Sequence, residues 1–285
     1  MSRRDGGDGD DAPSAEEARQ ETEEAEERSA PTGRVVYKAI LSEGESELER
    51  ASAALLWSGL AAGLSMGFSM FGEGLLMTYL PDAPWRPLVS RFGYSFGFLA
   101  VVLGRQQLFT ENTLTPILSL LQHRDAKTLR NVARLWALVL LANLIGAAII
   151  GTVAARTEAF DAAVRHSFLE IGRAEMAHGF GMTVLRGIFA GWLIALMVWL
   201  MPFAESSRIW VIVIVTYFVG LGGFPHIIAG TVATSAYAAA GAASAWDVAM
   251  RFALPSLIGN VIGGVVLVAL LNHAQVVGGE GEKRI

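Results

Sequence analysis

Long apolar stretches separated by short polar segments dominate the pattern of this chain. Four of them run without interruption, over about residues 54–76, 135–153, 182–201 and 254–271. A helix needs about twenty apolar residues to cross the hydrocarbon core of a bilayer, and each stretch is close to that length. The pattern therefore predicts an all-α polytopic membrane protein.

Two further apolar runs are interrupted near their middle. The run 209–240 contains two glycines, a proline and a histidine within residues 222–226. The run that begins near Phe92 carries a polar cluster around Leu108–Asn112. Lipid cannot hydrogen-bond a bare backbone, so a break at this depth must be buried in protein or line a cavity. We expect each run to form a half-helix, a loop and a second half-helix.

With the interrupted runs included, six predicted spans divide into two groups of three, and the second and fifth helices are the broken ones. An odd number of spans per group gives the groups opposite orientations, so the pattern is an inverted three-plus-three repeat. Matched interruptions of this kind indicate a site at the bilayer midplane. Both second half-helices would direct their N-termini towards the centre, where free N–H groups favour an anion or an electronegative solute. The alternative is two coincidentally kinked helices in a structural bundle.

The remaining segments differ from this central part. Residues 1–33 form an acidic, low-complexity tail without large apolar side chains, which predicts disorder. Residues 34–53 alternate apolar and charged groups, as an amphipathic lead-in on the membrane surface would. We assign 54–273 to a transmembrane pore domain and 274–285 to a short C-terminal tail. The cationic cluster 124–134, in a short loop, favours both termini in the cytoplasm.

Composition supports the membrane class and excludes several functions. Hydrophobic residues make up 53% of the chain and charged residues only 17%. In soluble domains about a quarter of all residues are charged. Cysteine is absent, which excludes disulfides and thiolate chemistry. No segment is basic enough to indicate nucleic acid. We found no metal-ligand cluster, nucleophile–base pair or paired carboxylates at mid-membrane, so we expect no enzyme activity, no metal and no cofactor.

His226 lies inside the break of the fifth span, and an ionisable residue at that depth indicates a functional site. A small carboxylate crosses an apolar constriction far more easily as the neutral acid than as an ion. An imidazole can offer a hydrogen bond or a proton at accessible pH. We therefore hypothesise that His226 assists the passage of a weak acid as anion plus proton. The alternative is a histidine that bonds a freed backbone group and fixes the loop.

Four segments resemble the formate/nitrite transporter family. LFTEN at 108–112 resembles that family's L-F-T-G-N loop, and GGFPHIIAG at 222–230 resembles its G-F-x-H-x-x-A-N segment. LPSLIGNVIGG at 254–264 is similar to its P-x-x-x-G-N-x-x-G-G motif, and 187–200 matches more loosely. The resemblance, over about residues 35–275, implies an aquaporin-like fold in a cell (inner or plasma) membrane. It also implies homopentamers, with one pore per protomer, that pass small monovalent anions such as formate or nitrite.

The resemblance also implies roles for individual residues. His226 would be the central pore histidine, and Asn260 would lie near the outer constriction, or else join helices. The loop that constricts the inner side would be Leu108, Phe109 and Thr110. Thr110 could bond His226 or cap its own half-helix, and Phe109 could be a gate or ordinary packing. Two apolar slit residues follow only by counting back from the motifs, namely Phe98 and Val219.

Several positions depart from the family pattern, and they touch anion handling. A glycine of the family is Glu111 here, the acid before that motif is Gln107, and the fourth-span asparagine is Gly191. The family has a lysine between the third and fourth spans. In this chain its position falls near Glu175, or Arg173 replaces it.

Arg105 and Arg186 are additional charges within apolar runs. We interpret Arg105 as a compensating partner of Glu111. Arg186 could extend to the outer interface or attract anions at the mouth.

Three other functions stay open at this stage. The architecture would also suit a pore for a small neutral solute or a weak base. A membrane enzyme is disfavoured by the missing catalytic groups. A scaffold acting through residues 1–33 is a further alternative.

Overall fold

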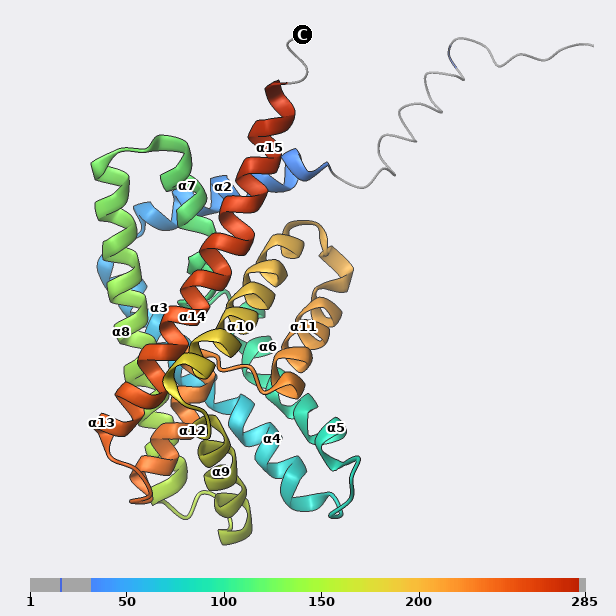
Figure 1. Cartoon of the computed structure of the whole chain (residues 1–285), viewed down its shortest axis with the longest axis vertical. Coiled ribbons are helices and arrows are strands. Elements are labelled where there is room, and N and C mark those ends of the chain that lie inside the picture. The colour runs from blue at the N-terminus through green and yellow to red at the C-terminus, as the bar shows by residue number, and fades with distance from the viewer. Residues whose placement is uncertain (1–15, 17–31, 282–285) are drawn as a thin grey trace, which may run out of the picture.

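The structure is a computed structural model that describes residue 16 and residues 32–281, and every regular element in this part of the chain is a helix (Figure 1). The tail predicted to be disordered, 1–33, therefore lies almost entirely outside the described residues, as do 282–285. The predicted lead-in is helix α2 (Gly33–Glu49), which packs beside α7 (Thr115–His123). It buries Tyr37, Ile40 and Leu48 at helical spacing, as an amphipathic helix does.

The four uninterrupted predicted spans coincide with four stretches that are long and apolar enough to cross a membrane. The first is Ser52–Tyr79, made of α3 (Ser52–Ser65) and α4 (Gly67–Tyr79). The second is α8 (Ala126–Arg156), and the third contains α10 (Phe180–Leu200).

The fourth stretch, Ala245–Val276, is a succession of shorter helical elements. In chain order these are α13 (Ala245–Asp247), the π-helix Val248–Ala253, α14 (Leu254–Gly264), the π-helix Val265–Leu270 and α15 (Leu271–Gly281). The helix thus continues through 274–281, which the sequence pattern had assigned to a tail.

The two interrupted runs form shorter helices. Helices α11 (Arg208–Gly222) and α12 (Ile227–Ala239) are bent by 49° across residues 223–226, and together they could make a fifth span. The bend begins at Gly223, whose φ of 57° is in the left-handed region that favours glycine. In the other run, α6 (Ser95–Leu103) and α7 have nine residues each, too few to span a bilayer alone. The six-span prediction depends on these two helices being one interrupted crossing.

Short helices connect these elements. They are α5 (Arg86–Ser90), α9 (Ala162–Glu175) and the 3-10 turns η1 (Arg91–Tyr94), η2 (Glu111–Thr113), η3 (Met201–Phe203) and η4 (Glu205–Ser207). Helices α2, α7 and α15 lie at one end of the bundle, which we call the terminal face (Figure 1). Helices α5, α9 and α13 lie towards the other end, which we call the opposite face.

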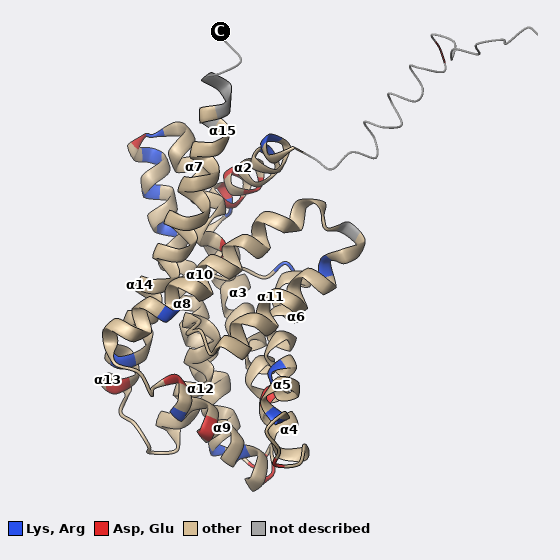
Figure 2. Cartoon of the chain, turned by 45° about the vertical axis from the view of Figure 1, so that its right-hand side comes forward, with Lys and Arg blue, Asp and Glu red and all other residues tan. Residues whose placement is uncertain are grey.

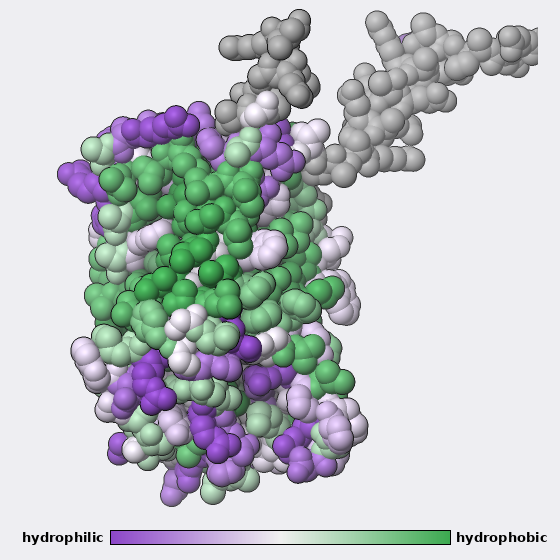
Figure 3. All heavy atoms as spheres, viewed as in Figure 1, coloured by the Kyte–Doolittle hydropathy of each residue, from purple (hydrophilic) through white to green (hydrophobic). Residues whose placement is uncertain are grey.

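Charge and hydropathy follow this division. Lys, Arg, Asp and Glu gather mostly towards the two ends of the bundle (Figure 2), and apolar side chains form a band between them (Figure 3). On α8, Leu141, Ile145 and Ile149 form an exposed stripe with about half of each side chain accessible. An apolar band of this size between charged ends is typical of a surface that faces lipid.

Two helix pairs pack with their backbones in close approach, α10 with α14 and α3 with α8. Glycines make the approach possible. A Cβ added at Gly191 of α10 would lie 2.2 Å from the carbonyl oxygen of Asn260 in α14. A Cβ added at Gly63 of α3 would lie 2.3 Å from the carbonyl oxygen of Asn143 in α8. Small residues at such contacts let transmembrane helices approach closely.

We expect Gly191→Ala to separate α10 from α14, because the new methyl group would collide with backbone that cannot move independently. Overpacking of this kind costs about 1–3 kcal/mol, so the thermal midpoint in detergent should fall. Gly181→Ala is the matched control on the same helix, since a Cβ there meets nothing within 4 Å. Equal midpoints for the two variants would contradict this account of the packing.

Candidate functional site

The two breaks meet at the centre of the bundle through one hydrogen bond. Thr110 Oγ1 lies 2.7 Å from His226 Nε2, and both side chains are fully buried. Nδ1 of the same ring accepts a hydrogen bond of 3.2 Å from the N–H of Ala229, so His226 is the N-cap of α12. A neutral imidazole that accepts at Nδ1 carries its proton on Nε2, and the Nε2–H group therefore donates to Thr110.

Both interpretations of His226 thus have a structural counterpart. The ring satisfies a backbone N–H freed at the start of α12, and it also reaches the other break. For Thr110 the structure supports one of the two roles, the bond to His226. Its side chain makes no capping hydrogen bond at the start of η2.

Asn260 holds the break between α11 and α12 by three hydrogen bonds. Its Nδ2 donates to the carbonyls of Gly187 and Pro225, both at 2.9 Å, and its Oδ1 accepts from the N–H of Ile227 at 2.9 Å. The side chain is fully buried. Of the two interpretations of Asn260, the structure favours the one in which it joins helices.

Asn143 does the same for the other break. Its Nδ2 donates to the carbonyls of Gly59, at 2.7 Å, and Gln107, at 2.9 Å, while its Oδ1 accepts from the N–H of Phe109 at 2.9 Å. The two asparagines therefore make the same three types of contact: one to the neighbouring helix and one to each side of the break. Sequence reasoning missed Asn143, although ANLIG at 142–146 parallels GNVIG at 259–263 and could have revealed it.

Apolar side chains surround this centre. The Phe98 ring meets the His226 ring edge-on, with 5.0 Å between centroids. Leu108, Phe109 and Val219 are at most 1% exposed. Phe109 also packs edge-on against Trp136, with 5.6 Å between centroids. The predicted slit and loop residues thus lie in the same buried core, and Phe109 has a packing partner of its own.

Arg186 makes backbone contacts that neither of the two roles considered from the sequence includes. Its Nη2 donates to the carbonyl oxygens of Gly222, at 2.7 Å, and Gly223, at 2.9 Å. These carbonyls end α11, where the helix dipole is negative, so the guanidinium neutralises it and fixes the start of the break. Its guanidinium carbon also lies 5.9 Å from the centroid of the Phe224 ring.

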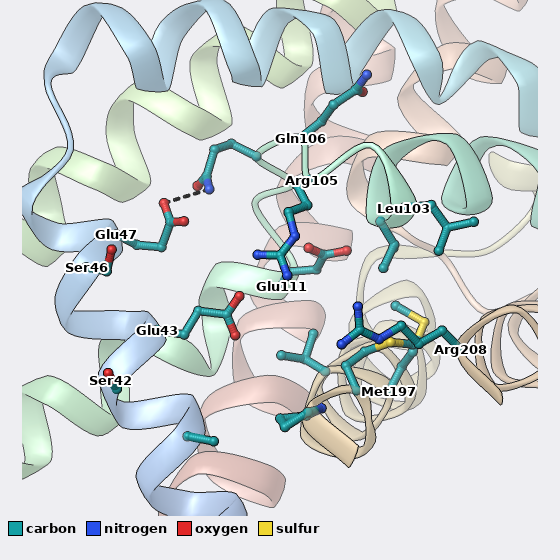
Figure 4. A pocket seen from close by; sticks show the side chains of 16 residues that line it. Ser42, Glu43, Ser46, Glu47, Leu103, Arg105, Gln106, Glu111, Met197 and Arg208 are labelled. Atoms are coloured by element: carbon teal, nitrogen blue, oxygen red, sulfur yellow. Dashed lines mark hydrogen bonds between the residues drawn. The ribbon is translucent and has the colours of Figure 1, made fainter. Parts of the chain in front are cut away.

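The other departures from the family pattern have different surroundings. Gly191 carries no side chain because the backbone of Asn260 occupies that space. Arg105 and Glu111 form no ion pair within 4.0 Å in the described part of the chain, so the compensating pair expected from the sequence is absent there. Both line a cavity at the terminal face (Figure 4). Within residues 16 and 32–281, no group of three His, Asp or Glu residues could hold a metal ion.

A second charged cluster lies on the opposite side of the break, where Glu73, buried in α4, pairs with Arg91 at 2.6 Å. Glu175, at the end of α9, belongs to the same cluster. Burial raises the pKa of Glu175 to about 7, and the charge of Glu73 also raises it, whereas Arg91 and Arg186 lower it. By contrast, Arg173 is exposed on α9.

Comparison with known proteins identifies related sequences. Residues 34–274 match the family model described as "Formate/nitrite transporter". The chain is 38% identical over 258 residues to the inner membrane protein YfdC of Escherichia coli (strain K12). This alignment covers 90% of this chain and 83% of that protein.

Solved structures show the same fold. A pentameric formate channel with formate bound superposes with a TM-score of 0.63 at 20% identity, over 87% of this chain and all 100% of that one. An ion channel of the FNT family superposes with a TM-score of 0.71 at 16% identity, over 83% of this chain and 97% of that one. These relatives are transporters and channels, not enzymes, in agreement with the expectation from the sequence.

Removal of the Asn260 side chain should destabilise the fold strongly. Asn260→Ala leaves the N–H of Ile227 and the carbonyl of Pro225 unpaired in a buried site, and each such group costs about 1–3 kcal/mol. Asn272→Ala is the control, because that side chain makes a single hydrogen bond, to Val268 of its own helical segment. Thermal unfolding in detergent measures both, and a loss for Asn260→Ala no larger than that for Asn272→Ala would refute the role given to Asn260.

The raised pKa of Glu175 predicts a pH-dependent cost. Between the ordinary pKa of 4.5 and about 7, the folded chain retains a proton that the unfolded chain has lost. Stability therefore falls as the pH rises through this window. Glu175→Gln should abolish the effect. The thermal midpoint of this variant should therefore be higher than that of the wild type at pH 8 but not at pH 5. Glu170→Gln, in the same helix, serves as the control, and an equal gain in that variant would argue against the assignment.

Proposed function

Because this chain belongs to the formate/nitrite transporter family, and is thus an integral membrane protein, we propose that it forms a transmembrane pore for small monovalent anions of weak acids, such as formate or nitrite. The family match over 34–274 and the formate channel that superposes on the chain support the substrate class. The single observation that carries the proposal is the hydrogen bond between Thr110 and His226, which joins two buried helix breaks inside apolar walls.

The proposed architecture has six crossings in an inverted three-plus-three repeat, as in aquaporins. The crossings are α3–α4, α6–α7, α8, α10, α11–α12 and α13–α15. The matching hydrogen bonds of Asn143 and Asn260 support the repeat, because each asparagine comes from the third crossing of its group and holds the break in the second.

The chemistry of the centre suits a weak acid. A bare anion between Phe98, Leu108, Phe109 and Val219 would lose its hydration without a compensating charge, which costs several kcal/mol. The neutral acid avoids this cost, so the substrate crosses this segment together with a proton. The Thr110 hydroxyl and the Nε2–H group of His226 then exchange their mutual bond for bonds to the passing acid.

The remaining residues position this centre. Asn143 and Asn260 hold the two breaks, and Arg186 fixes the end of α11, so these three act on the pore without lining it. The positive ends of the half-helices α7 and α12 point towards the centre and favour an electronegative substrate.

We further propose that the terminal face is cytoplasmic, with both termini on that side. The cationic residues around the start of α8 support this orientation. They are Arg124, Lys127, Arg130 and Arg134. The protein would act as a homopentamer in the cell membrane, surrounded by lipid, because the matched formate channel is pentameric and α8 exposes an apolar stripe.

A second candidate substrate is a small neutral solute or a weak base. Two carboxylates without an ion pair at the terminal face favour it, namely Glu43 and Glu111, since an anion is repelled by each of them when ionised. Swelling of proteoliposomes in uncharged solutes, compared with uptake of formate, separates the two candidates. Swelling without anion uptake would favour this second candidate.

His226→Asn should reduce the uptake of formate, nitrite, acetate and hydrosulfide into proteoliposomes. Asparagine is a good N-cap and can keep the bond to Ala229, but it is too short to replace Nε2 opposite Thr110. We expect at least a roughly tenfold loss of rate, which corresponds to about 1.4 kcal/mol in the barrier. His123→Asn, at the exposed end of α7, is the control. If His226→Asn takes up these substrates as fast as the wild type at two pH values, the role proposed for His226 is refuted.

A further inference from the structure

A cavity of about 560 Å³ opens at the terminal face (Figure 4). One side of α2, the segment from α6 to Gln107, η2, the end of α10 and the start of α11 surround it. Gln107 and Glu111 line the cavity and directly flank Leu108–Thr110 in the chain. The cavity therefore lies against the loop to which we assign the constriction on this side.

Glu47 is neutralised and tied in place within this cavity. Arg50 forms an ion pair with it at 3.1 Å, and Gln107 Nε2 donates to its Oε2 at 2.7 Å (Figure 4). The oxygen of the Gln107 side chain accepts from Asn112 Nδ2 at 3.0 Å. Glu47 thus anchors α2 to the α6–α7 connection and is not available to a ligand.

Four charged groups remain, two carboxylates and two guanidinium groups: Glu43, Glu111, Arg105 and Arg208. No ion pair within 4.0 Å joins them in the described part of the chain. Buried polar atoms of the lining also have no hydrogen-bond partner there, namely Glu111 Oε1, Gln106 Oε1 and Arg208 Nε. Opposite charges that surround a cavity without pairing, beside unsatisfied atoms, indicate a site built for something else.

The charge balance of the lining identifies what the cavity can bind. With all four groups ionised, the two negative and two positive charges cancel, and an anion gains little on entry. One added proton leaves a net charge of +1, and the planar guanidinium groups are suited to a carboxylate. We infer that this cavity is a loading site that takes up one small weak-acid anion together with one proton. The inference rests on the proposed function and names the place where its substrate is neutralised.

Glu111 is the group that holds the proton. Its Oε1 is buried without a donor, whereas the Glu43 side chain is exposed at the rim. Of the other helices packed on η2, α14 has no charged residue, and the end of α10 contributes Met197 and Val198 to the lining.

Arg105 and Arg208 bind the anion in this scheme. The O–H bond of the Glu111 carboxyl then breaks, an O–H bond forms on the anion, and the neutral acid moves on to the constriction. Solvent at the terminal face returns the proton to Glu111.

Titration calorimetry of the full chain in detergent, with sodium formate as the probe, tests the inference. Two buffers of different ionisation enthalpy report the protons taken up on binding. The wild type should take up about one proton per formate at pH 9, and its affinity should fall by up to about tenfold per pH unit as the pH rises further. In Glu111→Gln the proton uptake should approach zero and the affinity should become independent of pH.

Two further variants complete the test. Arg208→Gln should weaken formate binding by about tenfold or more, as expected for the loss of a charge-assisted hydrogen bond. Arg130→Gln, which removes an exposed guanidinium outside the lining, should bind as the wild type does. Wild-type binding without proton uptake overturns the inference even if Glu111→Gln fails to fold, and so does unchanged affinity in Arg208→Gln.

The inference and the proposed function can fail separately. His226→Phe should block transport yet retain proton-linked formate binding, because the cavity lies before the constriction. Proton-linked binding without transport of any weak acid by the wild type would refute the proposed function alone. Transport without proton-linked binding at the cavity would refute the loading site alone.

Discussion

The structure depends on how backbone groups are satisfied where the chain passes from α6 to α7 and from α11 to α12 in an apolar environment. An unpaired N–H or C=O group costs several kcal/mol where neither water nor a helix partner is available. Asn143 and Asn260 each satisfy two such backbone groups and bond a neighbouring helix as well, and His226 and Arg186 satisfy further groups at the break between α11 and α12. Only because these bonds exist can the chain leave helical geometry and bring Thr110 and His226 together.

The asparagines can act in this way only if their helices lie close to the neighbouring ones. Glycines such as Gly63 and Gly191 provide this closeness, since backbone atoms of Asn143 and Asn260 occupy the space that a Cβ would need. A glycine at position 191, which departs from the family pattern, is therefore a packing requirement in this chain. The helix pairing and the polar centre are two parts of one arrangement.

The sequence allowed a good prediction of the four uninterrupted apolar helices, because apolar run length acts locally. His226 could be recognised as unusual from its position, and its link to Thr110 was one of two options. The clamp of Arg186 on Gly222 could not be predicted, since the two residues meet only after α10 and α11 pack. Arg105 and Glu111 were wrongly expected to pair, because closeness in sequence does not fix the direction in which two side chains of an irregular connection point.

Charge balance on both sides of the centre follows from the same packing. Each side has two acidic and two basic groups that contact or influence one another. On the opposite face these are Glu73, Glu175, Arg91 and Arg186. At the terminal face they are Glu43, Glu111, Arg105 and Arg208. A pore mouth lined by charges of one sign concentrates ions of the opposite sign. A pore flanked on both sides by equal numbers of acidic and basic groups does not concentrate anions in this way. In the proposed function a weak acid therefore gains access by bringing a proton, because the proton makes the site attractive to the anion and the anion acceptable to the apolar constriction.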